Sequence, residues 1–426
     1  MRCARPVAVA IALLFPLLLP VLVGTTQTGW QANSRIVSET TEKQSGFNYE
    51  ESRVPPYTLP DTLVSGGQRV RTPEEWRRRR TEILELFRAN VYGRSPGRPE
   101  RLRFELLEEN ERAMDGAATL KRIAVVSLQA ERDHRFDLTL FLPNARQGPA
   151  PVFLLLNNRT VGNTDPTRRE QSDFWPAEQV IARGYGIAAI QVGDLAPDDK
   201  ERFREGAIRL FEDSAAARPD TAWAALAAWA WGARRAMDYF ETDARVDDRR
   251  VAIVGHSRGG KAALWAGAED ERFTLVVANE SGEGGAALSR RFFGETLARI
   301  TDAFPHWFAG KYRTFSGRPE ALPVDQHMLL SLIAPRGLYV ASADEDLWAD
   351  PRGEFLGQVH ASPVFALWGD RPMGVEDMPP LNRPLVVGRR GYHVRRGGHN
   401  LTRYDWQCFM DFSDALWRGG RAKPPA

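Results

Sequence analysis

The chain of 426 residues is long enough for one large domain or two small ones. Hydrophobic residues make up 43% of it and charged residues 26%, which is typical of a globular protein with a sizeable core. The formal net charge is only +2, so the composition excludes a protein that binds nucleic acid through a strongly basic surface.

The first 25 residues have the pattern of a secretory signal peptide. A short basic start is followed by an apolar run that Pro16 and Pro20 interrupt. A retained membrane anchor is the competing interpretation, but the run is short for a membrane span and broken by proline. We therefore expect residues 1–25 to be removed, and the mature protein to be secreted or periplasmic, with no membrane association.

The cysteine content excludes a disulfide framework. Cys3 falls in the predicted signal peptide, which leaves Cys408 alone in the mature chain. Cys408 lies in a helix-like segment, where we expect it to be a packed core thiol. No group of Cys and His residues has the spacing of metal ligands, so we expect no metal site.

Residues 26–60 are polar and show no clear periodicity, which predicts a leader that lies on the surface. The segment TPEEWRRRRTEILELFRANV, which begins at Thr72, then carries helix-start signals: a capping threonine, Pro73 at the first helical position and acids in the first turn. Its four arginines at 77–80 could be a nucleic-acid patch, but we favour a solvated helix face.

Segments with strand and helix patterns alternate through the rest of the chain. Strands are expected at 120–128, 136–143, 151–157, 186–192, 251–255, 274–279 and 337–343, and helices at 219–240, 352–368 and 402–418. This alternation predicts the α/β class, with a mainly parallel twisted sheet in a three-layer αβα sandwich. The early strands have no helices between them, so that edge should be antiparallel. Without repeats or linkers, residues 61–426 are expected to form a single domain.

The helix at 219–240 is rich in alanine and tryptophan. Trp223, Trp229 and Trp231 could line a sugar site. Aromatic residues on an alanine-rich helix more often pack against a sheet, so we favour packing.

The pentapeptide GHSRG at 255–259 fits the nucleophile elbow of the α/β-hydrolase fold. It follows a predicted strand and opens a predicted helix, which is the context that the G-x-S-x-G pattern requires. The sharp turn leaves no room for side chains at Gly255 and Gly259, and it exposes the hydroxyl of Ser257. We favour a catalytic Ser257 over a serine that merely caps the helix.

A serine nucleophile needs a base, and in this fold the histidine comes last in the chain. His399 lies in a glycine-rich loop just before the final helix, whereas His393 lies in a strand-like segment, so we favour His399. His256 should point away from Ser257 and have a structural role. The remaining histidines have no obvious place in a triad: His134, His306, His327 and His360.

Two acids could orient the imidazole. Glu280 and Asp346 each follow a predicted strand, and both lie between Ser257 and His399, so chain order does not choose between them.

Four segments together resemble bacterial glucuronoyl esterases of carbohydrate esterase family 15: GHSRGGK, NESGEGG, LPVDQHMLL with LIAPRGLYVASADEDLWADP, and GGHNLTRYDW. The likeness runs from about residue 85 to the last helix, and the extended pattern G-x-S-R-x-G-K is much more specific than G-x-S-x-G. The resemblance implies a serine hydrolase without a cofactor. Its substrate would be the ester between 4-O-methyl-glucuronic acid of glucuronoxylan and a lignin alcohol.

The resemblance also implies roles for individual residues. Ser257 matches the nucleophile, His399 the base and Arg258 the oxyanion-stabilising residue. Glu280 matches the acid of fungal members and Asp346 that of bacterial members; we favour Glu280, with Asp346 assisting or substituting. The positions that resemble uronate contacts are Lys261, Glu295, Gln326 and Trp348. Glu283 departs from the small residue expected there, and it should either alter the pH dependence or face solvent.

Two cations at a helix start oppose the helix dipole and need a reason. Lys261 lies one turn after Ser257 and could donate to sugar hydroxyls, while Arg258 could donate to an oxyanion. The competing interpretation is that both are solvated. Trp348 could stack on the sugar or belong to the core.

Two other functions remain open. An acetyl or feruloyl esterase on the same fold would need the same triad but neither Arg258 nor Lys261. A non-catalytic polysaccharide-binding protein is disfavoured because Ser257, His399 and both acids are present. We expect a monomer, since no coiled-coil pattern suggests assembly, and we expect the polar loop at 157–174 to border the site.

Overall fold

The computed structural model describes residues 29–213, 217–374 and 377–418, so the predicted signal peptide lies outside the described residues. Over this part of the chain, no helix is long and apolar enough to cross a membrane. The predicted α/β class with a mainly parallel sheet is confirmed, because ten strands form one sheet in the order β11-β12-β10-β9-β8-β6-β7-β5-β4-β3.

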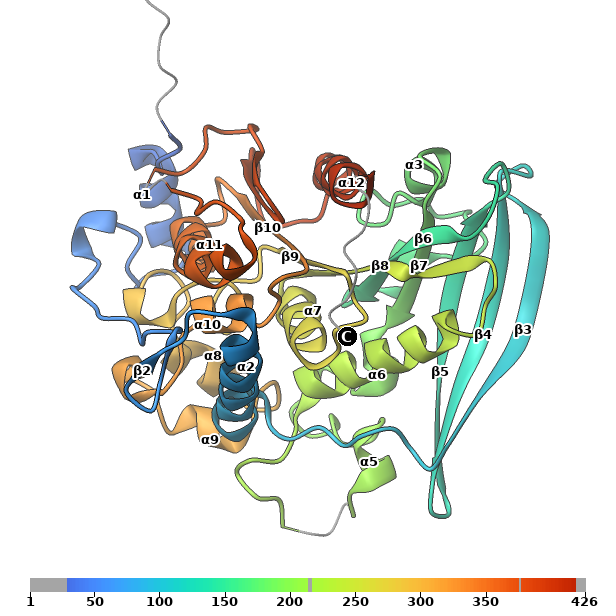
Figure 1. Ribbon diagram of the computed structural model, residues 1–426, viewed down its shortest axis with the longest axis horizontal. Coiled ribbons are helices and arrows are strands. Elements are labelled where there is room, and N and C mark those ends of the chain that lie inside the picture. Colours follow the sequence, from blue (N-terminus) through green and yellow to red (C-terminus); the bar gives the residue numbers. More distant parts are fainter. Residues whose placement is uncertain (1–28, 214–216, 375–376, 419–426) are drawn as a thin grey trace, which may run out of the picture.

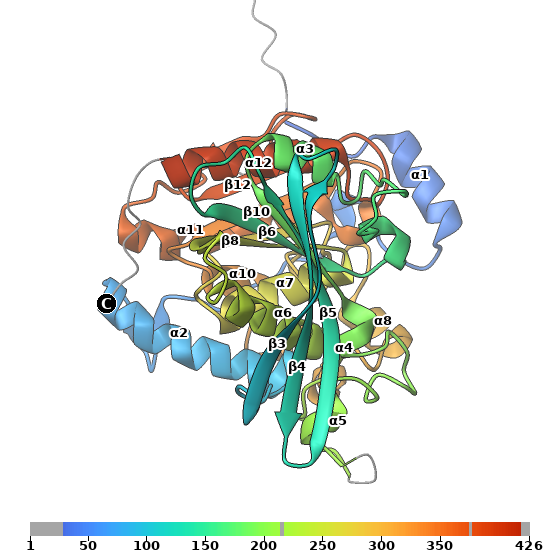
Figure 2. The same ribbon diagram turned by 90° about the vertical axis from the view of Figure 1, so that its right-hand side faces the viewer.

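The central strands of this sheet are parallel and its two edges antiparallel. The strands are β3 (Arg101–Ala113), β4 (Ala118–Gln129), β5 (Arg132–Pro143), β6 (Ala150–Asn157), β7 (Gly186–Gln191), β8 (Val246–His256), β9 (Leu275–Asn279), β10 (Gly337–Ala343), β11 (Leu385–Val387) and β12 (Arg390–Arg395). A separate small hairpin joins β1 (Val64–Ser65) to β2 (Gln68–Arg69). The antiparallel β3–β4–β5 edge confirms the prediction for the early strands, and Figure 2 shows these long strands twisting across one another.

Helices cover both faces of the sheet (Figure 1). The longer ones are α1 (Ser34–Lys43), α2 (Pro73–Phe87), α6 (Ala225–Phe240), α7 (Arg258–Glu269), α11 (Pro351–Phe365) and α12 (Arg403–Arg418). The shorter ones are α3 (Ala177–Ala182), α4 (Val192–Leu195), α5 (Ile208–Phe211), α8 (Leu297–Ala303), α9 (Gly310–Arg313) and α10 (Gln326–Ser331). Helices α6, α7 and α11 pack on one face and α3 and α12 on the other, so each face has its own apolar core. The αβα layering is therefore as predicted.

The tryptophans in α6 and just before it belong to the core. Trp223, Trp229 and Trp231 are each at most 2% exposed, so packing is confirmed and the sugar-site alternative is wrong. Helix α6 begins at Ala225, six residues later than predicted, since Pro219 and the following residues form a turn. Cys408 is a buried free thiol, as predicted.

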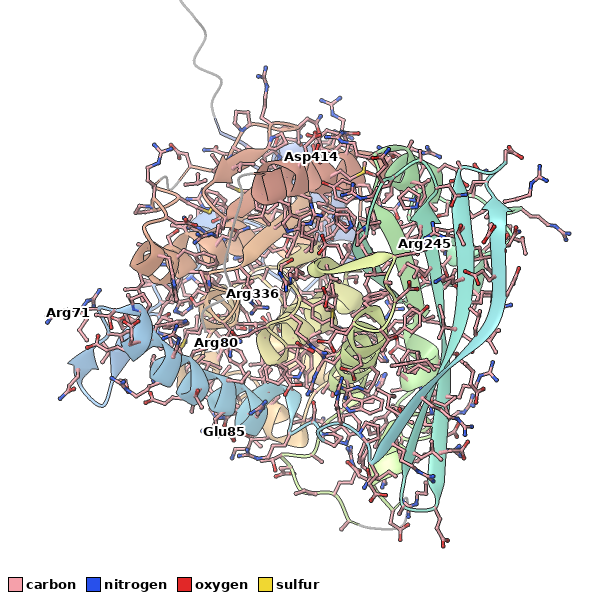
Figure 3. All side chains as sticks on the ribbon, turned by 45° about the vertical axis from the view of Figure 1, so that its right-hand side comes forward. Arg71, Arg80, Glu85, Arg245, Arg336 and Asp414 are labelled. Carbon is pink, nitrogen blue, oxygen red and sulfur yellow. The ribbon has the colours of Figure 1, made fainter. Side chains whose placement is uncertain are left out.

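Helix α2 begins with the predicted capping threonine, and Thr72 and Glu75 form a capping box in which each satisfies the other's backbone N–H group. Its arginines are only partly a solvated face. Arg80 turns inward and donates to the carbonyl oxygens of Ala268 and Leu332, and Arg336 beside it donates to Gly267 (Figure 3). These bonds satisfy carbonyls at the ends of α7 and α10 that have no partner within their helices.

The segment before α2 is more ordered than its polar sequence suggests. It forms α1, and Ile36 and Tyr49 are buried against Phe293 and Leu347. Glu51 pairs with Arg291 at 2.7 Å. The segment thus packs against loops that follow β9 and β10, although its hydrophobic residues are too sparse to show a periodicity.

The turn between β8 and α7 depends on the absence of side chains at two glycines. A Cβ at Gly255 would collide with the carbonyl oxygen of Gly259, and one at Gly259 would lie 3.1 Å from the carbonyl oxygen of Leu156 on β6. Strand and helix therefore approach each other as closely as backbones allow.

Replacing Gly255 with Ala should lower the free energy of unfolding by about 1–3 kcal/mol, because the new methyl group has no space. Urea denaturation would measure the loss. Gly193→Ala in α4 is the matched control, since a Cβ there meets nothing within 4 Å. Equal stability of the two variants would contradict the close approach of β8 and α7.

Candidate active site

Ser257 lies at the carboxyl edge of the sheet in a strained backbone conformation. Its φ of 57° and ψ of −129° belong to a region that side chains rarely adopt. Its N–H donates to the Asn279 carbonyl oxygen at 2.8 Å, and its own carbonyl oxygen accepts from Gly260. The first N–H groups of α7 have no partner within the helix, so they are available to a negative charge beside Ser257.

His399 contacts both candidate acids through one ring nitrogen. Nδ1 lies 2.6 Å from Asp346 Oδ2 and 3.2 Å from Glu280 Oε2. The side chains of Asp346 and Glu280 are at most 5% exposed, whereas that of His399 is 39% exposed. Because Nδ1 is held by carboxylates, Nε2 is left for proton exchange. Of the two acids, Asp346 makes the shorter contact, although we favoured Glu280.

Glu280 is fixed by more than the imidazole. Its φ is 47°, and its Oε1 accepts from Arg395 Nη2 at 2.5 Å while its Oε2 accepts from the Asn400 N–H at 2.9 Å. Arg395, at the end of β12, also donates to both oxygens of Asp405 and to the carbonyl oxygens of Gly398 and Asn400. This one arginine joins the acid to the loop that carries the histidine. No local sequence pattern marks Arg395 as part of the site.

The pKa values of this cluster shift in opposing ways. Burial raises the pKa of Glu280 to about 8, against the lowering effect of His399 and Arg395. Burial lowers the pKa of His399, but Asp346 and Glu280 outweigh it and raise that pKa to about 10. Asp346, which lies nearest to the ring, is the main cause of the raised pKa of His399.

The other two histidines near this edge have structural partners. His256 accepts from Arg159 Nη2 at 3.2 Å through Nε2, and its Nδ1 then donates to Asn279 Oδ1 at 2.6 Å. Its ring lies 4.4 Å from that of His399, so it lines the site beside the candidate base. His393 is buried in β12 between Tyr339 and Asp405, apart from the triad.

The nitrogen and oxygen atoms of His256, Glu280 and His399 lie within 4.8 Å of one another, which could suggest a metal site. Arg159 contacts His256, and Arg395 contacts Glu280. Two guanidinium groups at such distances disfavour a bound cation.

The two cations that follow Ser257 share one aromatic surface. The Arg258 guanidinium carbon lies 5.9 Å and Lys261 Nζ 6.0 Å from the ring centre of Trp307. Lys261 is 4% exposed and donates to the Ser281 carbonyl oxygen at 2.6 Å, so the solvated interpretation is wrong for it. Burial lowers the pKa of Lys261, against the opposing charges of Glu295 and Glu283.

Trp348 and Glu295 come together from two loops. The Glu295 N–H donates to the Trp348 carbonyl oxygen at 2.9 Å, and the Trp348 ring is only partly buried. Phe47 packs edge-on against this ring at 4.8 Å, and Asn48 accepts from the Gly294 N–H. The segment before α2 therefore supports these two candidate substrate contacts.

Glu283 does not face solvent, so that alternative is wrong. It is 3% exposed, and its Oε1 accepts from Ser289 Oγ at 2.7 Å and from the Tyr312 hydroxyl at 2.8 Å. Burial raises its pKa to about 8. Gln326 is also fully buried, with its Nε2 3.5 Å from Ser289 Oγ. Of the candidate substrate contacts, Gln326 is thus the most deeply placed.

The loop at 157–174 borders the site. Asn157 anchors its start by donating to the Thr160 carbonyl oxygen and to Gln191, and Arg159 contacts His256, which lies against His399. Val161 on this loop is 71% exposed.

A family model described as "Glucuronyl esterase, fungi" matches residues 125–369. The chain belongs to the glucuronyl esterase family. A glucuronoyl esterase structure from Solibacter usitatus is 42% identical and covers 86% of this chain and 100% of its own, with a TM-score of 0.81. The carbohydrate esterase MZ0003 from an unknown prokaryotic organism is 39% identical over 93% of this chain and 97% of its own.

The 4-O-methyl-glucuronoyl methylesterase of Schizophyllum commune is 27% identical over 75% of each chain. These matches confirm the resemblance to family 15 and the α/β-hydrolase fold. The protein is a carboxylic ester hydrolase of this family.

Replacing Asp346 with Asn should lower the pKa of His399 by about one unit or more, because a negative charge beside Nδ1 is lost. Because its pKa is raised, the charged imidazole stabilises the folded protein fully below about pH 6.5, and this stabilisation fades as the pH approaches about 10. We expect the stabilisation to be smaller in the variant. An NMR titration of the His399 ring measures the pKa directly.

Glu345→Gln is the matched control, since this neighbouring acid is exposed and its removal should leave the titration unchanged. An unaltered pKa of His399 in the Asp346→Asn variant would show that Glu280 alone sets it.

Proposed function

We propose that this esterase hydrolyses the ester between (4-O-methyl-)glucuronic acid of glucuronoxylan and lignin alcohols, through a glucuronoyl ester on Ser257. Its relatives are named 4-O-methyl-glucuronoyl methylesterases, which agrees with this substrate class. The observation that carries the proposal is a histidine–acid pair beside the residue that precedes Ser257, together with two cations near the Trp307 ring. Charge of this kind suits a polar uronate and would be of little use to an enzyme for apolar esters.

In the proposed reaction, His399 removes the proton of Ser257 as the hydroxyl attacks the C6 carbonyl carbon of the ester. Negative charge develops on the carbonyl oxygen, where the backbone N–H groups at the start of α7 and the Arg258 guanidinium stabilise it. His399 then protonates the leaving alcohol. Water hydrolyses the glucuronoyl ester by the reverse proton path and restores Ser257.

The two acids keep the imidazole correctly oriented and stabilise its protonated form. Asp346 makes the shorter contact with Nδ1, and Glu280 adds a second carboxylate that Arg395 holds in place. A base must be neutral to accept a proton, so activity should rise with pH as His399 loses its proton.

The uronate ring would lie between Trp348, which offers an aromatic face, and the polar groups of Lys261 and Glu295. Lys261 has ammonium hydrogens beyond the one that it donates to Ser281, and these would serve as donors to ring hydroxyls. Gln326 is fully buried beside Ser289, so we do not place it in contact with the ring.

Further parts of the proposal rest on the sequence. Residues 1–25 would direct the chain out of the cytoplasm, to the periplasm or the outside, where xylan is met. Residues 26–60 would be a leader packed on a single catalytic domain, residues 61–426, that acts as a monomer without a cofactor. The acetyl or feruloyl esterase alternative is not favoured, because such esters would not use Lys261.

Wild-type enzyme should hydrolyse benzyl glucuronate far faster than 4-nitrophenyl acetate, and Ser257→Ala should lose about 10⁴-fold or more of this activity, since the nucleophile is removed. Release of benzyl alcohol and of 4-nitrophenol would measure both reactions. Activity on the acetate alone would leave the nucleophile in place and overturn the substrate. Activity on neither ester, with binding of xylan retained, would favour the binding-protein hypothesis.

A further inference from the structure

The side chain of Arg258 is held at two points. Its Nε lies 2.6 Å from Asp198 Oδ2, and its Nη2 donates to the Asn158 carbonyl oxygen at 3.1 Å. A guanidinium has five N–H donors, so both hydrogens of Nη1 are left for another partner. An ion pair with Asp198 and one hydrogen bond to Asn158 hold the group in place without using all of its donors, and the Nε hydrogen is not aligned for a hydrogen bond.

Asp198 is itself fixed by two neighbours. Its Oδ1 accepts from His306 Nε2 at 2.9 Å and from Trp307 Nε1 at 2.6 Å. Burial opposes ionisation, but these bonds and the charge of Arg258 keep the pKa of Asp198 below its usual value. Its carboxylate is therefore charged near neutral pH and attracts the guanidinium.

Trp307 completes the support for Arg258. It is 5% exposed and stacks on Phe304 with the ring centres 3.8 Å apart, so its position is fixed. Its indole N–H contacts Asp198 while its ring faces the Arg258 guanidinium. Carboxylate and ring thus act on the same cation from two elements, the loop after α4 and the loop between α8 and α9.

We propose that Asp198 is a positioning residue that, with Trp307, holds the Arg258 guanidinium where the oxyanion forms. The proposal rests on the proposed function in one respect, that Arg258 stabilises this oxyanion. Asp198 touches no reacting atom. A free arginine side chain samples many rotamers, and ordering it during the reaction would cost free energy. A donor that is already in place avoids that cost, which is the condition for strong oxyanion stabilisation.

Replacing Asp198 with Asn removes the charge but keeps the shape. We expect kcat for benzyl glucuronate to fall about 10- to 100-fold, as for a misplaced catalytic group, with KM changed less than about twofold. Asp198→Glu, which restores the charge, should recover part of kcat. Asp199→Asn is the matched control. The carboxylate of Asp199 accepts from the N–H groups of Glu201 and Arg202 in its own loop, so its replacement should leave kcat unchanged.

A double-mutant cycle separates positioning from a general loss of structure. In an Arg258→Ala background, Asp198→Asn should change kcat less than about twofold, since nothing is left to position. The same large loss in both backgrounds would overturn the proposal, and so would a change confined to KM. Melting temperatures of all variants establish that folded proteins are compared.

The cycle is also measured with 4-nitrophenyl acetate, because every ester forms an equivalent oxyanion. Coupling between Asp198 and Arg258 on the acetate, without activity on the glucuronate, would support the positioning role and overturn the proposed substrate. Activity on the glucuronate without coupling on either ester would support the proposed substrate and overturn the positioning role.

Discussion

The site depends on one buried ion pair, between Arg395 and Glu280. An unpaired buried carboxylate is costly, and the pair is tolerated here because Arg395 also satisfies Asp405 and two carbonyl oxygens of the His399 loop. This single guanidinium joins the ends of β9 and β12 and the start of α12. Arg395 thereby ties Glu280 to the loop that carries His399, while Asp346 holds the imidazole itself.

A second buried carboxylate shapes the loop after Glu280. Glu354 of α11 accepts from the N–H groups of Ser281 and Gly282 and from the Ser342 hydroxyl, and burial raises its pKa to about 7. The carbonyl oxygen of Ser281 in turn accepts from Lys261. Glu280 and the proposed sugar-binding Lys261 are thus both positioned by the loop that begins at Ser281. Glu354 stabilises this loop through its backbone N–H groups.

The features that could be predicted from the sequence are those with local patterns. The elbow at Ser257 has a fixed spacing of glycines, and most strands of the parallel sheet are continuous apolar runs. By contrast, Arg395, Glu354 and Asp198 act through partners up to 115 residues away, and no local pattern marks them. Strand β3 was missed because its exposed edge is rich in charged residues, and α1 because few of its residues are buried. Chain order could not choose between Glu280 and Asp346, and the structure brings both to the same nitrogen.

The central claim is that a uronate ester binds with its carbonyl carbon at Ser257 and its ring against Lys261 and Trp348. A crystal structure of the Ser257→Ala variant with methyl 4-O-methylglucuronate tests this most directly. We expect the carbonyl oxygen to accept from Arg258 and the ring to lie on the exposed face of Trp348. A sugar bound elsewhere, or with its ester directed away from residue 257, would contradict the claim.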